Sequence, residues 1–363
     1  MNIQSKAIVS LPPRTANHFI PAYALKDETF ELSSLRYKYY KFLLLCIRII
    51  ARVRLQYFGP KHDVDPDNNL VEKIYHREAQ TYERKHHRTT NFRDTWWRRQ
   101  LGMDVVSHWM SDRDSGTIPI KLLDLATGVG LSAEEMLRVC LASEVSCDVT
   151  ALDYNQKMLD EGIQYTLPRM RSEGLVDDKK RKASFVRGDA RKLLAESRPE
   201  NGLRTFDKNY FDVVTIMFGA GGVDDPLAMF CQVLGILKNG GVFAMLDIHR
   251  PVKEIRERWP FYIDSSHADV FAFLAWEYAT KPLVLRALWG WRDPSYMFYV
   301  LPLVCKEEKG KYWSFRVMSL QLNNEPWWLK LPVMKTAHIL VEKVEIPKDE
   351  YNKRTSILES IKY

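Results

Sequence analysis

The chain has 363 residues, of which 46% are hydrophobic and 27% are charged, so one large domain with additions, or two domains, fits. The net charge of +7 is not gathered into basic blocks with interleaved aromatic residues, which argues against a nucleic-acid partner. The five cysteines form no Cys-x-x-Cys pair and no metal-ligand spacing. We therefore expect free thiols, a reducing compartment and no metal site.

Residues 1–30 contain three prolines and little periodicity, and we expect them to form an extended arm. They lack the continuous apolar core of a signal peptide and have few basic residues. The sequence therefore predicts a cytoplasmic protein.

Residues 37–57 contain no acidic residue, and at helical spacing four basic side chains share one side: Lys38, Lys41, Arg48 and Arg52. The uninterrupted apolar run, 42–47, is too short to cross a bilayer, which needs about 20 residues. Two interpretations stay open. One is a helix packed on the rest of the protein with its basic edge in water. The other is a helix in the plane of a membrane surface, where the basic side meets lipid phosphates.

Residues 70–85 predict a helix on which Tyr75 and Tyr82, seven positions apart, share a face. Two tryptophans and two arginines follow at 96–99, a pattern typical of a packed helix whose charged edge reaches water. We expect residues 31–116 to form a helical N-terminal cap.

Residues 121–131 read Lys-Leu-Leu-Asp-Leu-Ala-Thr-Gly-Val-Gly-Leu. The apolar run 122–125 predicts a buried strand, Gly128 and Gly130 permit a tight turn, and 132–138 predict the next helix. Nucleotide-like ligands bind at such a strand, turn and helix N-terminus. Residues 117–250 are therefore the expected ligand-binding core.

Two cofactors fit this turn, because Gly128-x-Gly130-x-x-Ala133 also satisfies the dinucleotide pattern. Asp153, at the end of the next predicted strand (149–152), suits a ribose in either case. Asp124 precedes the glycines, and an acid there suits an ammonium and a sulfonium better than a pyrophosphate. This favours S-adenosyl-L-methionine.

Three more strands are predicted at 183–190, 211–218 and 241–247, with a helix at 226–237. Asp189, near the end of the first of them, is placed to accept a hydrogen bond from an adenine amino group. Strands that alternate with helices at this spacing predict an α/β fold with a parallel sheet.

The glycine turn and residues 75–83, 97–99, 211–219 and 237–251 resemble class I methyltransferases, most closely the C-methyltransferases of ubiquinone and menaquinone biosynthesis. The resemblance covers roughly residues 72–251. It implies a Rossmann-like sheet of seven strands, a methyl transfer and a position for Tyr82 near the methionine end of the cofactor.

The expected cofactor-binding residues are Tyr82, Asp124, Ala126, Thr127, Gly128, Gly130, Asp153, Tyr154, Met158, Asp189, Ala190 and Met217. The family has an arginine and an asparagine after the fourth strand, where this chain has Gly221 and Gly222. Asp247, His249 and Tyr75 are therefore our candidates for handling the acceptor. Structural roles for Tyr75 and His249 remain the alternatives.

Residues 251–310 are rich in aromatic side chains and predict a helical insertion over the acceptor pocket, although a second small core or half of a homodimer contact fits too. Residues 311–345 predict a final antiparallel strand pair, with strands at 312–322 and 336–344. We expect residues 346–363 to form a charged, peripheral tail.

The sequence thus predicts a methyltransferase for a hydrophobic small molecule, aromatic or lipid-like, with C-methylation favoured by the resemblance. O- or N-methylation of a specialised metabolite is one alternative. An inactive cofactor-binding fold that serves as an interaction protein is another.

Overall fold

The computed structural model describes residues 75–76, 79–89, 94–111, 118–197, 202–248, 297–323 and 336–360. The predictions for the arm at 1–30, for the segment at 37–57 and for His249 lie outside these residues, as does most of the insertion at 251–310.

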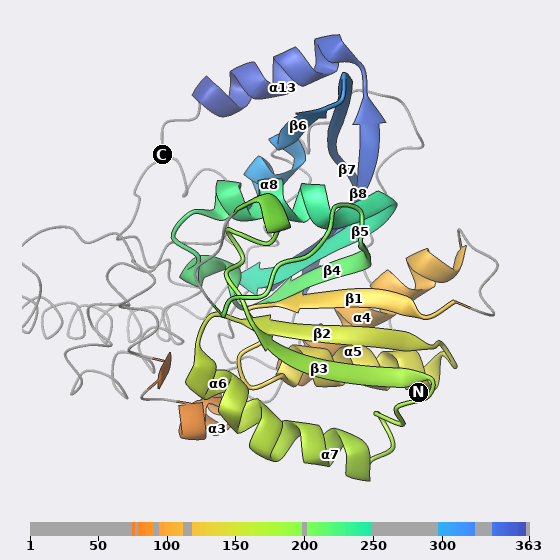
Figure 1. Ribbon diagram of the computed structural model, residues 1–363, viewed down its shortest axis with the longest axis vertical. Coiled ribbons are helices and arrows are strands. Elements are labelled where there is room, and N and C mark those ends of the chain that lie inside the picture. The colour runs from red at the N-terminus through yellow and green to blue at the C-terminus, as the bar shows by residue number, and fades with distance from the viewer. Residues whose placement is uncertain are drawn as a thin grey trace, which may run out of the picture.

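An eight-stranded sheet in the order β3-β2-β1-β4-β5-β8-β7-β6 organises the described chain (Figure 1). The first five strands in this order are parallel, and β8, β7 and β6 add to β5 in antiparallel fashion. The strands are β1 (Ile120–Leu125), β2 (Cys147–Asp153), β3 (Arg181–Arg187), β4 (Phe211–Met217), β5 (Leu237–Ile248), β6 (Cys305–Glu308), β7 (Lys311–Asn323) and β8 (Thr336–Ile346).

The Rossmann-like fold was predicted correctly, whereas the predicted count of seven strands was wrong by one. The extra strand, β6, pairs with β7 across a two-residue turn in which Lys309 and Gly310 both have positive φ, 52° and 75°. Such turns match the twist of a hairpin. Because β6 has only four residues and no apolar alternation, the sequence pattern did not reveal it.

Helices cover both faces of the sheet, with α4 and α5 on one face and α8 on the other (Figure 1). Every residue of β4 is buried, as expected for a parallel strand covered on both sides. The helices are α3 (Tyr82–Thr89), α4 (Asp94–Ser111), α5 (Leu131–Ala142), α6 (Gln156–Glu161), α7 (Leu167–Ser172), α8 (Pro226–Ile236), α12 (Met297–Val300) and α13 (Lys348–Ser360). Short 3-10 or π turns are η2 (Ala79–Thr81), η3 (Gly162–Thr166), η4 (Ala195–Ser197), η5 (Ala220–Gly222) and η7 (Leu301–Leu303).

The helix after β1 begins where the glycine turn predicted it. Gly130 caps α5 with a φ of 93°, and a Cβ at this position would lie 2.7 Å from Cζ of Phe185 on β3. Only glycine permits both this backbone conformation and this close packing.

The C-terminal helix α13 lies beside β6 and β7. Arg354 fastens it there, because its guanidinium donates to the carbonyl oxygens of Pro302 and Phe315 and to the hydroxyl of Ser314.

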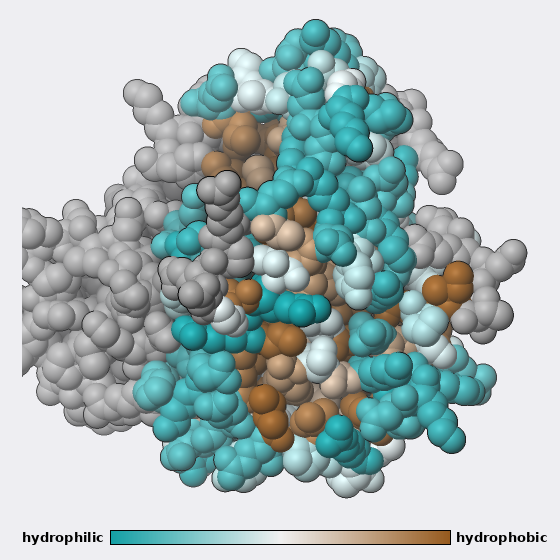
Figure 2. Space-filling model, in the orientation of Figure 1, coloured by the Kyte–Doolittle hydropathy of each residue, from teal (hydrophilic) through white to brown (hydrophobic). Residues whose placement is uncertain are grey.

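Figure 2 shows one face of the molecule, on which hydrophilic residues dominate over α7 and α13 and apolar residues occupy narrower areas between them. Among the described residues, no helix combines the length and the apolar character needed to cross a membrane.

Candidate active site

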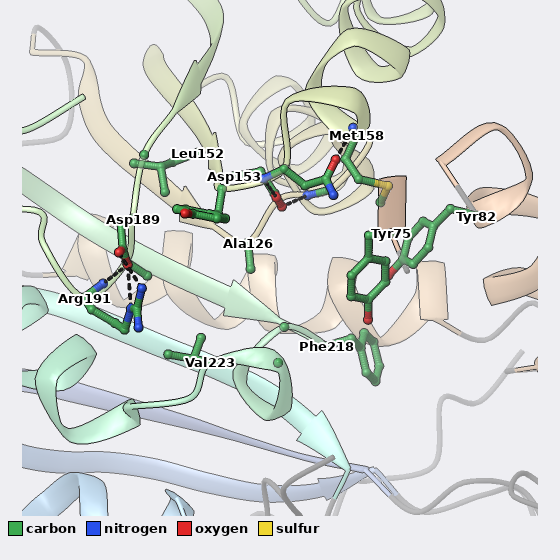
Figure 3. Close-up of a pocket in the computed structure, with 17 residues that line it drawn as sticks. Tyr75, Tyr82, Ala126, Leu152, Asp153, Met158, Asp189, Arg191, Phe218 and Val223 are labelled. Atoms are coloured by element: carbon green, nitrogen blue, oxygen red, sulfur yellow. Dashed lines mark hydrogen bonds and ion pairs between the residues drawn. The ribbon is translucent and has the colours of Figure 1, made fainter. Parts of the chain in front are cut away.

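A pocket lies at the carboxyl ends of β1, β2 and β4, where the glycine turn follows β1 (Figure 3). Its lining includes nine of the residues predicted to bind the cofactor or handle the acceptor: Tyr75, Tyr82, Ala126, Gly128, Asp153, Tyr154, Met158, Asp189 and Ala190. It also includes residues that were not predicted to bind the cofactor or handle the acceptor: Leu152, Asn155, Gly188, Arg191, Phe218, Gly219, Gly222 and Val223. Asp189 and Arg191 lie at one end of the pocket, and Tyr75, Tyr82 and Phe218 lie at the other.

Asp153 is held by the backbone around it at the end of β2. Its Oδ2 accepts from the amide of Gly128 at 2.7 Å, and its Oδ1 accepts from the amide of Asn155 at 2.8 Å. Burial raises the pKa of this carboxyl to about 6, and the amide donors offset the shift in part. The carboxylate is therefore fixed in orientation and is charged above about pH 6.

The glycine turn leaves no space for side chains. Gly128 has a φ of 58°, and a Cβ there would lie 3.0 Å from Cε of Met158. Across the pocket, a Cβ on Gly219 would lie 2.5 Å from Cβ of Ala126. Ala126 and Phe218 themselves have positive φ values of 49° and 61°, a costly conformation for residues other than glycine and one that concentrates at binding sites.

Asp124 is fully buried one residue before the end of β1. Its Oδ1 accepts from the hydroxyl of Thr215 at 2.8 Å. Its Oδ2 and the buried hydroxyl of Thr127 make no well-aligned hydrogen bond among the described residues, although this hydroxyl lies close enough to the carboxyl to lower its pKa in part. Burial raises the pKa of Asp124 to about 6. Unpaired buried oxygens beside a glycine turn fit a ligand that brings a cationic donor, such as an ammonium group.

Aromatic rings form the other end of the pocket. Tyr75 meets Tyr82 edge-on with ring centroids 5.8 Å apart, and Tyr82 stacks on His86 at 5.5 Å. His86 in turn meets the ring of Phe218 at 5.2 Å. Burial raises the pKa of Tyr82 to about 12, so its phenol stays neutral. Aromatic faces of this kind attract a cation such as a sulfonium.

Arg98 packs against this aromatic end without lining the pocket. Its guanidinium lies 5.0 Å from the ring centre of Phe218 and donates to Ser132 Oγ, Asp94 Oδ2 and His86 Nε2 at 3.0, 3.2 and 3.2 Å. The prediction that the arginines at 98 and 99 reach water was wrong for Arg98, which is buried because Asp94 compensates its charge. Arg99 is exposed, as predicted, and pairs with Glu135.

The two histidines of α3 are held in different protonation states. Burial, with the nearby charge of Arg98, lowers the pKa of His86 to about 3, so its Nε2 accepts from that guanidinium. The carboxylate of Asp94, 2.9 Å from Nδ1 of His87, raises the pKa of His87 to about 9, with a contribution from Glu83. Asp94 thereby joins α3, which carries Tyr82, to α4.

The remaining predicted site residues lie behind the pocket wall. Asp247 is buried near the end of β5, where its Oδ2 accepts from the amide of Ala220 at 3.2 Å and so supports the turn after β4. Met217 is buried in the core that β4 shares with α4 and α5, and Gly130 packs on Phe185. Thr127 and Asp124 lie beside the turn. None of these five predicted residues lines the pocket: Asp124, Thr127, Gly130, Met217 and Asp247.

The pocket residues that were not predicted have sequence patterns that do not point to a binding site. Phe218 follows the apolar run of β4 directly and looked like its last core residue. Arg191 stands two positions after Asp189, and its partner Asp224 is 33 residues further along the chain.

A parallel sheet that ends in antiparallel strands, with a glycine turn after β1 and a fixed carboxylate at the end of β2, defines a class I methyltransferase core. The family model for the "ubiE/COQ5 methyltransferase family" matches residues 64–272. The chain therefore belongs to the ubiE/COQ5 methyltransferase family.

Individual relatives are more distant. A ubiquinone/menaquinone biosynthesis C-methyltransferase of Shewanella pealeana is 30% identical over 139 residues, which cover 38% of this chain and 47% of the relative. A demethylmenaquinone methyltransferase of Leptospira interrogans is 26% identical over 234 residues, covering 64% and 76%. The chain spans about half the length of the first of these curated relatives.

Among solved structures, the plantazolicin methyltransferase BpumL is 12% identical, with coverage of 84% of this chain and 99% of that protein and a TM-score of 0.42.

Proposed function

We propose that this protein transfers a methyl group from S-adenosyl-L-methionine to a carbon of a hydrophobic, quinone-like aromatic acceptor. The observation that carries the proposal is the pocket itself. The carboxylate of Asp153, held by backbone amides, and the glycine turn lie near its middle, and the aromatic rings at one end pack against the buried guanidinium of Arg98. Family membership supports both the cofactor and the class of acceptor.

The described residues fit this cofactor. Asp153 is oriented by two amides to accept from the ribose hydroxyls, and the buried carboxylate of Asp124 behind the glycine turn favours the positive charge of the ammonium group without lining the pocket. Gly128 lets the backbone approach the ligand closely, because a side chain there would meet Met158 and Tyr82.

When bound, the cofactor supplies a methyl group on an electrophilic sulfonium. The task of the protein is then mainly to align donor and acceptor, which is worth roughly 7 to 11 kcal/mol of the barrier in favourable cases. We assign this alignment to Tyr82 and Phe218. Tyr82 is held through its stack on His86, and Phe218 is held by Arg98. Their apolar faces also exclude water from the reacting carbon.

Activation of the acceptor must differ from that of the family, because Gly222 lines the pocket without a side chain where the resemblance places a polar residue. We propose that His249, which follows β5 in the sequence, takes up this role, and that Asp247 acts indirectly by holding the turn after β4 through the amide of Ala220. The bare glycines also favour a second candidate, O- or N-methylation of a specialised metabolite, since a nucleophilic oxygen or nitrogen needs less activation than a ring carbon.

The test is a product assay. The purified protein is incubated with S-adenosyl-L-methionine and, separately, with a short-chain demethylated naphthoquinol, a phenol and an aromatic amine. Mass spectrometry detects methylation and NMR locates the methyl group. A ring-methylated naphthoquinol supports the first candidate, and an ether or N-methyl product supports the second. Binding of S-adenosylhomocysteine without any product would instead favour the interaction protein.

A further inference from the structure

Arg191 joins two loops that leave the sheet from different strands. Its Nε and Nη2 donate to the two oxygens of Asp189 at 2.9 and 2.8 Å. Its Nη1 donates to both oxygens of Asp224 at 2.7 Å. Asp189 follows β3 and Asp224 follows β4, and the sheet order places the ends of β2 and β1 between them. The guanidinium therefore bridges the two sides of one end of the pocket.

This bridge belongs to the pocket wall. Asp189 and Arg191 line the pocket on the β3 side, and Val223, the neighbour of Asp224, lines it on the β4 side (Figure 3). The side chains of Arg191 and Asp224 are 23% and 25% exposed, so water screens the ion pair only in part. Arg191 contacts Asp189 through two nitrogens, Nε and Nη2, which fixes the relative orientation of these two groups, whereas a single nitrogen, Nη1, reaches Asp224.

Arg191 also determines how Asp189 can be used. The amide and the Nε of Arg191 both donate to Oδ1 at 2.9 Å, and Nη2 occupies Oδ2. A carboxylate accepts about four hydrogen bonds, so one acceptor position remains for a ligand. Arg191 thereby fixes the orientation of the Asp189 carboxylate, which lines the pocket.

We propose that Arg191 is a clasp for the cofactor: its ion pair with Asp224 holds the loops after β3 and β4 together over the adenosine end and slows cofactor release. Arg191 is thus a positioning residue for binding. The inference rests on the proposed cofactor, and it is independent of the acceptor.

A clasp has a kinetic signature. A ligand enclosed by the two loops leaves when the pair opens, so weakening the pair raises the dissociation rate much more than it changes the association rate. Salt should act in the same direction, because it screens the partly exposed pair.

The experiment measures release of radiolabelled S-adenosylhomocysteine after a chase with excess unlabelled ligand, together with its affinity by calorimetry. The variants are Asp224→Asn, Arg191→Gln and the double variant. We expect Asp224→Asn to speed release about three- to tenfold and Arg191→Gln to speed it somewhat more, because Arg191→Gln also frees Asp189. The double variant should match Arg191→Gln, since both changes remove the same pair.

Glu196→Gln is the matched control. It removes the exposed ion pair with Lys208, at 2.9 Å, from the chain that follows β3, and neither residue lines the pocket. Release from this variant should equal that from the wild type. Higher salt should accelerate release from the wild type and should have less effect on Asp224→Asn.

The outcomes distinguish a failure of the proposed clasp from a failure of the proposed cofactor or reaction. If Asp224→Asn lowers the melting temperature and leaves the release rate unchanged, the ion pair is structural only and the clasp is refuted. If Arg191→Gln fails to fold, the release rate from Asp224→Asn and the salt dependence of release still test the clasp. A wild type that does not bind S-adenosylhomocysteine would overturn the cofactor and the clasp together. Faster release from Asp224→Asn without methylation of any acceptor would support the clasp and count against the proposed reaction alone.

Discussion

Asp124→Asn tests whether the charge buried behind the glycine turn lowers stability. The carboxyl is fully buried, and its pKa rises from 3.8 to about 6 because burial disfavours the charged form. At about 1.4 kcal/mol per pKa unit, keeping this group ionised costs about 3 kcal/mol of folding free energy at neutral pH.

The sign follows from proton binding. Between the unfolded pKa of 3.8 and the folded pKa of about 6, the folded state binds the proton more tightly, so the contribution of Asp124 to stability decreases as pH rises through this window. An asparagine has no such dependence. The free energy of unfolding of Asp124→Asn, relative to wild type, should therefore increase by about 2 kcal/mol from about pH 4.5 to about pH 7.5.

Urea unfolding of both proteins across this pH range measures the difference. A constant offset is expected as well, because the amide nitrogen takes the place of an unpaired oxygen, so the slope with pH is the test. Asp212→Asn is the matched control. This buried carboxylate already accepts from Lys238 Nζ at 2.9 and 3.0 Å and from the amide of Lys121 at 3.0 Å, so its replacement should destabilise the protein. A difference between Asp124→Asn and wild type that stays flat with pH would refute the argument.

Four further predictions concern other parts of the chain. Gly128→Val should abolish S-adenosylhomocysteine binding in calorimetry while the circular dichroism of the sheet persists, because the φ of 58° and the contact with Met158 exclude a side chain; retained binding would place the turn elsewhere. Asp153→Ala should weaken that binding by about 1.5 to 3 kcal/mol, the value of a charge-assisted hydrogen bond, and an unchanged affinity in a folded variant would refute its role. His87 has a folded pKa of about 9, above the unfolded 6.5, so its ion pair with Asp94 contributes fully below about pH 6.5 and is lost as pH rises through 9. After allowance for partial exposure, the stability advantage of wild type over His87→Gln should shrink by about 1 to 2 kcal/mol between neutral pH and about pH 10, and thermal melts showing a constant advantage would contradict this. If residues 37–57 bind a membrane surface, wild type should sediment with anionic vesicles at low salt and the Arg48→Glu, Arg52→Glu double variant should not, since each basic residue adds about 1 kcal/mol; no sedimentation of wild type would leave only the packed helix.

The elements around the site were predictable because their signals are local. An apolar run, an acid and two glycines within eleven residues gave β1, its turn and the start of α5, and the positive φ values of Gly128 and Gly130 supply the physical reason. The edge-on contact between Tyr75 and Tyr82 likewise agrees with their spacing of seven positions on one predicted helical face.

The polar network of the site was not predictable, because its partners are distant in sequence. Arg98 is buried through Asp94, four positions away, and also through Ser132, 34 positions away. Arg191 reaches Asp224 across the ends of two strands. Asp94 and Arg98 are one helical turn apart, but the sequence does not show that this pair is buried. Only the sheet order shows that Arg191 meets Asp224.

Several energetically unfavourable features of the described site lie together at the carboxyl ends of the parallel strands. Asp124 and Asp153 both carry a raised pKa, and Ala126 and Phe218 both hold a positive φ. These features can persist because β4, which is buried throughout, and β1, which is buried except at Lys121, fix the backbone that leads into the pocket. A cationic ligand would lower the energetic cost of the two buried carboxylates and would not change the cost of the two positive φ values. Binding should therefore raise stability more above pH 6, where both carboxylates are charged, than below it.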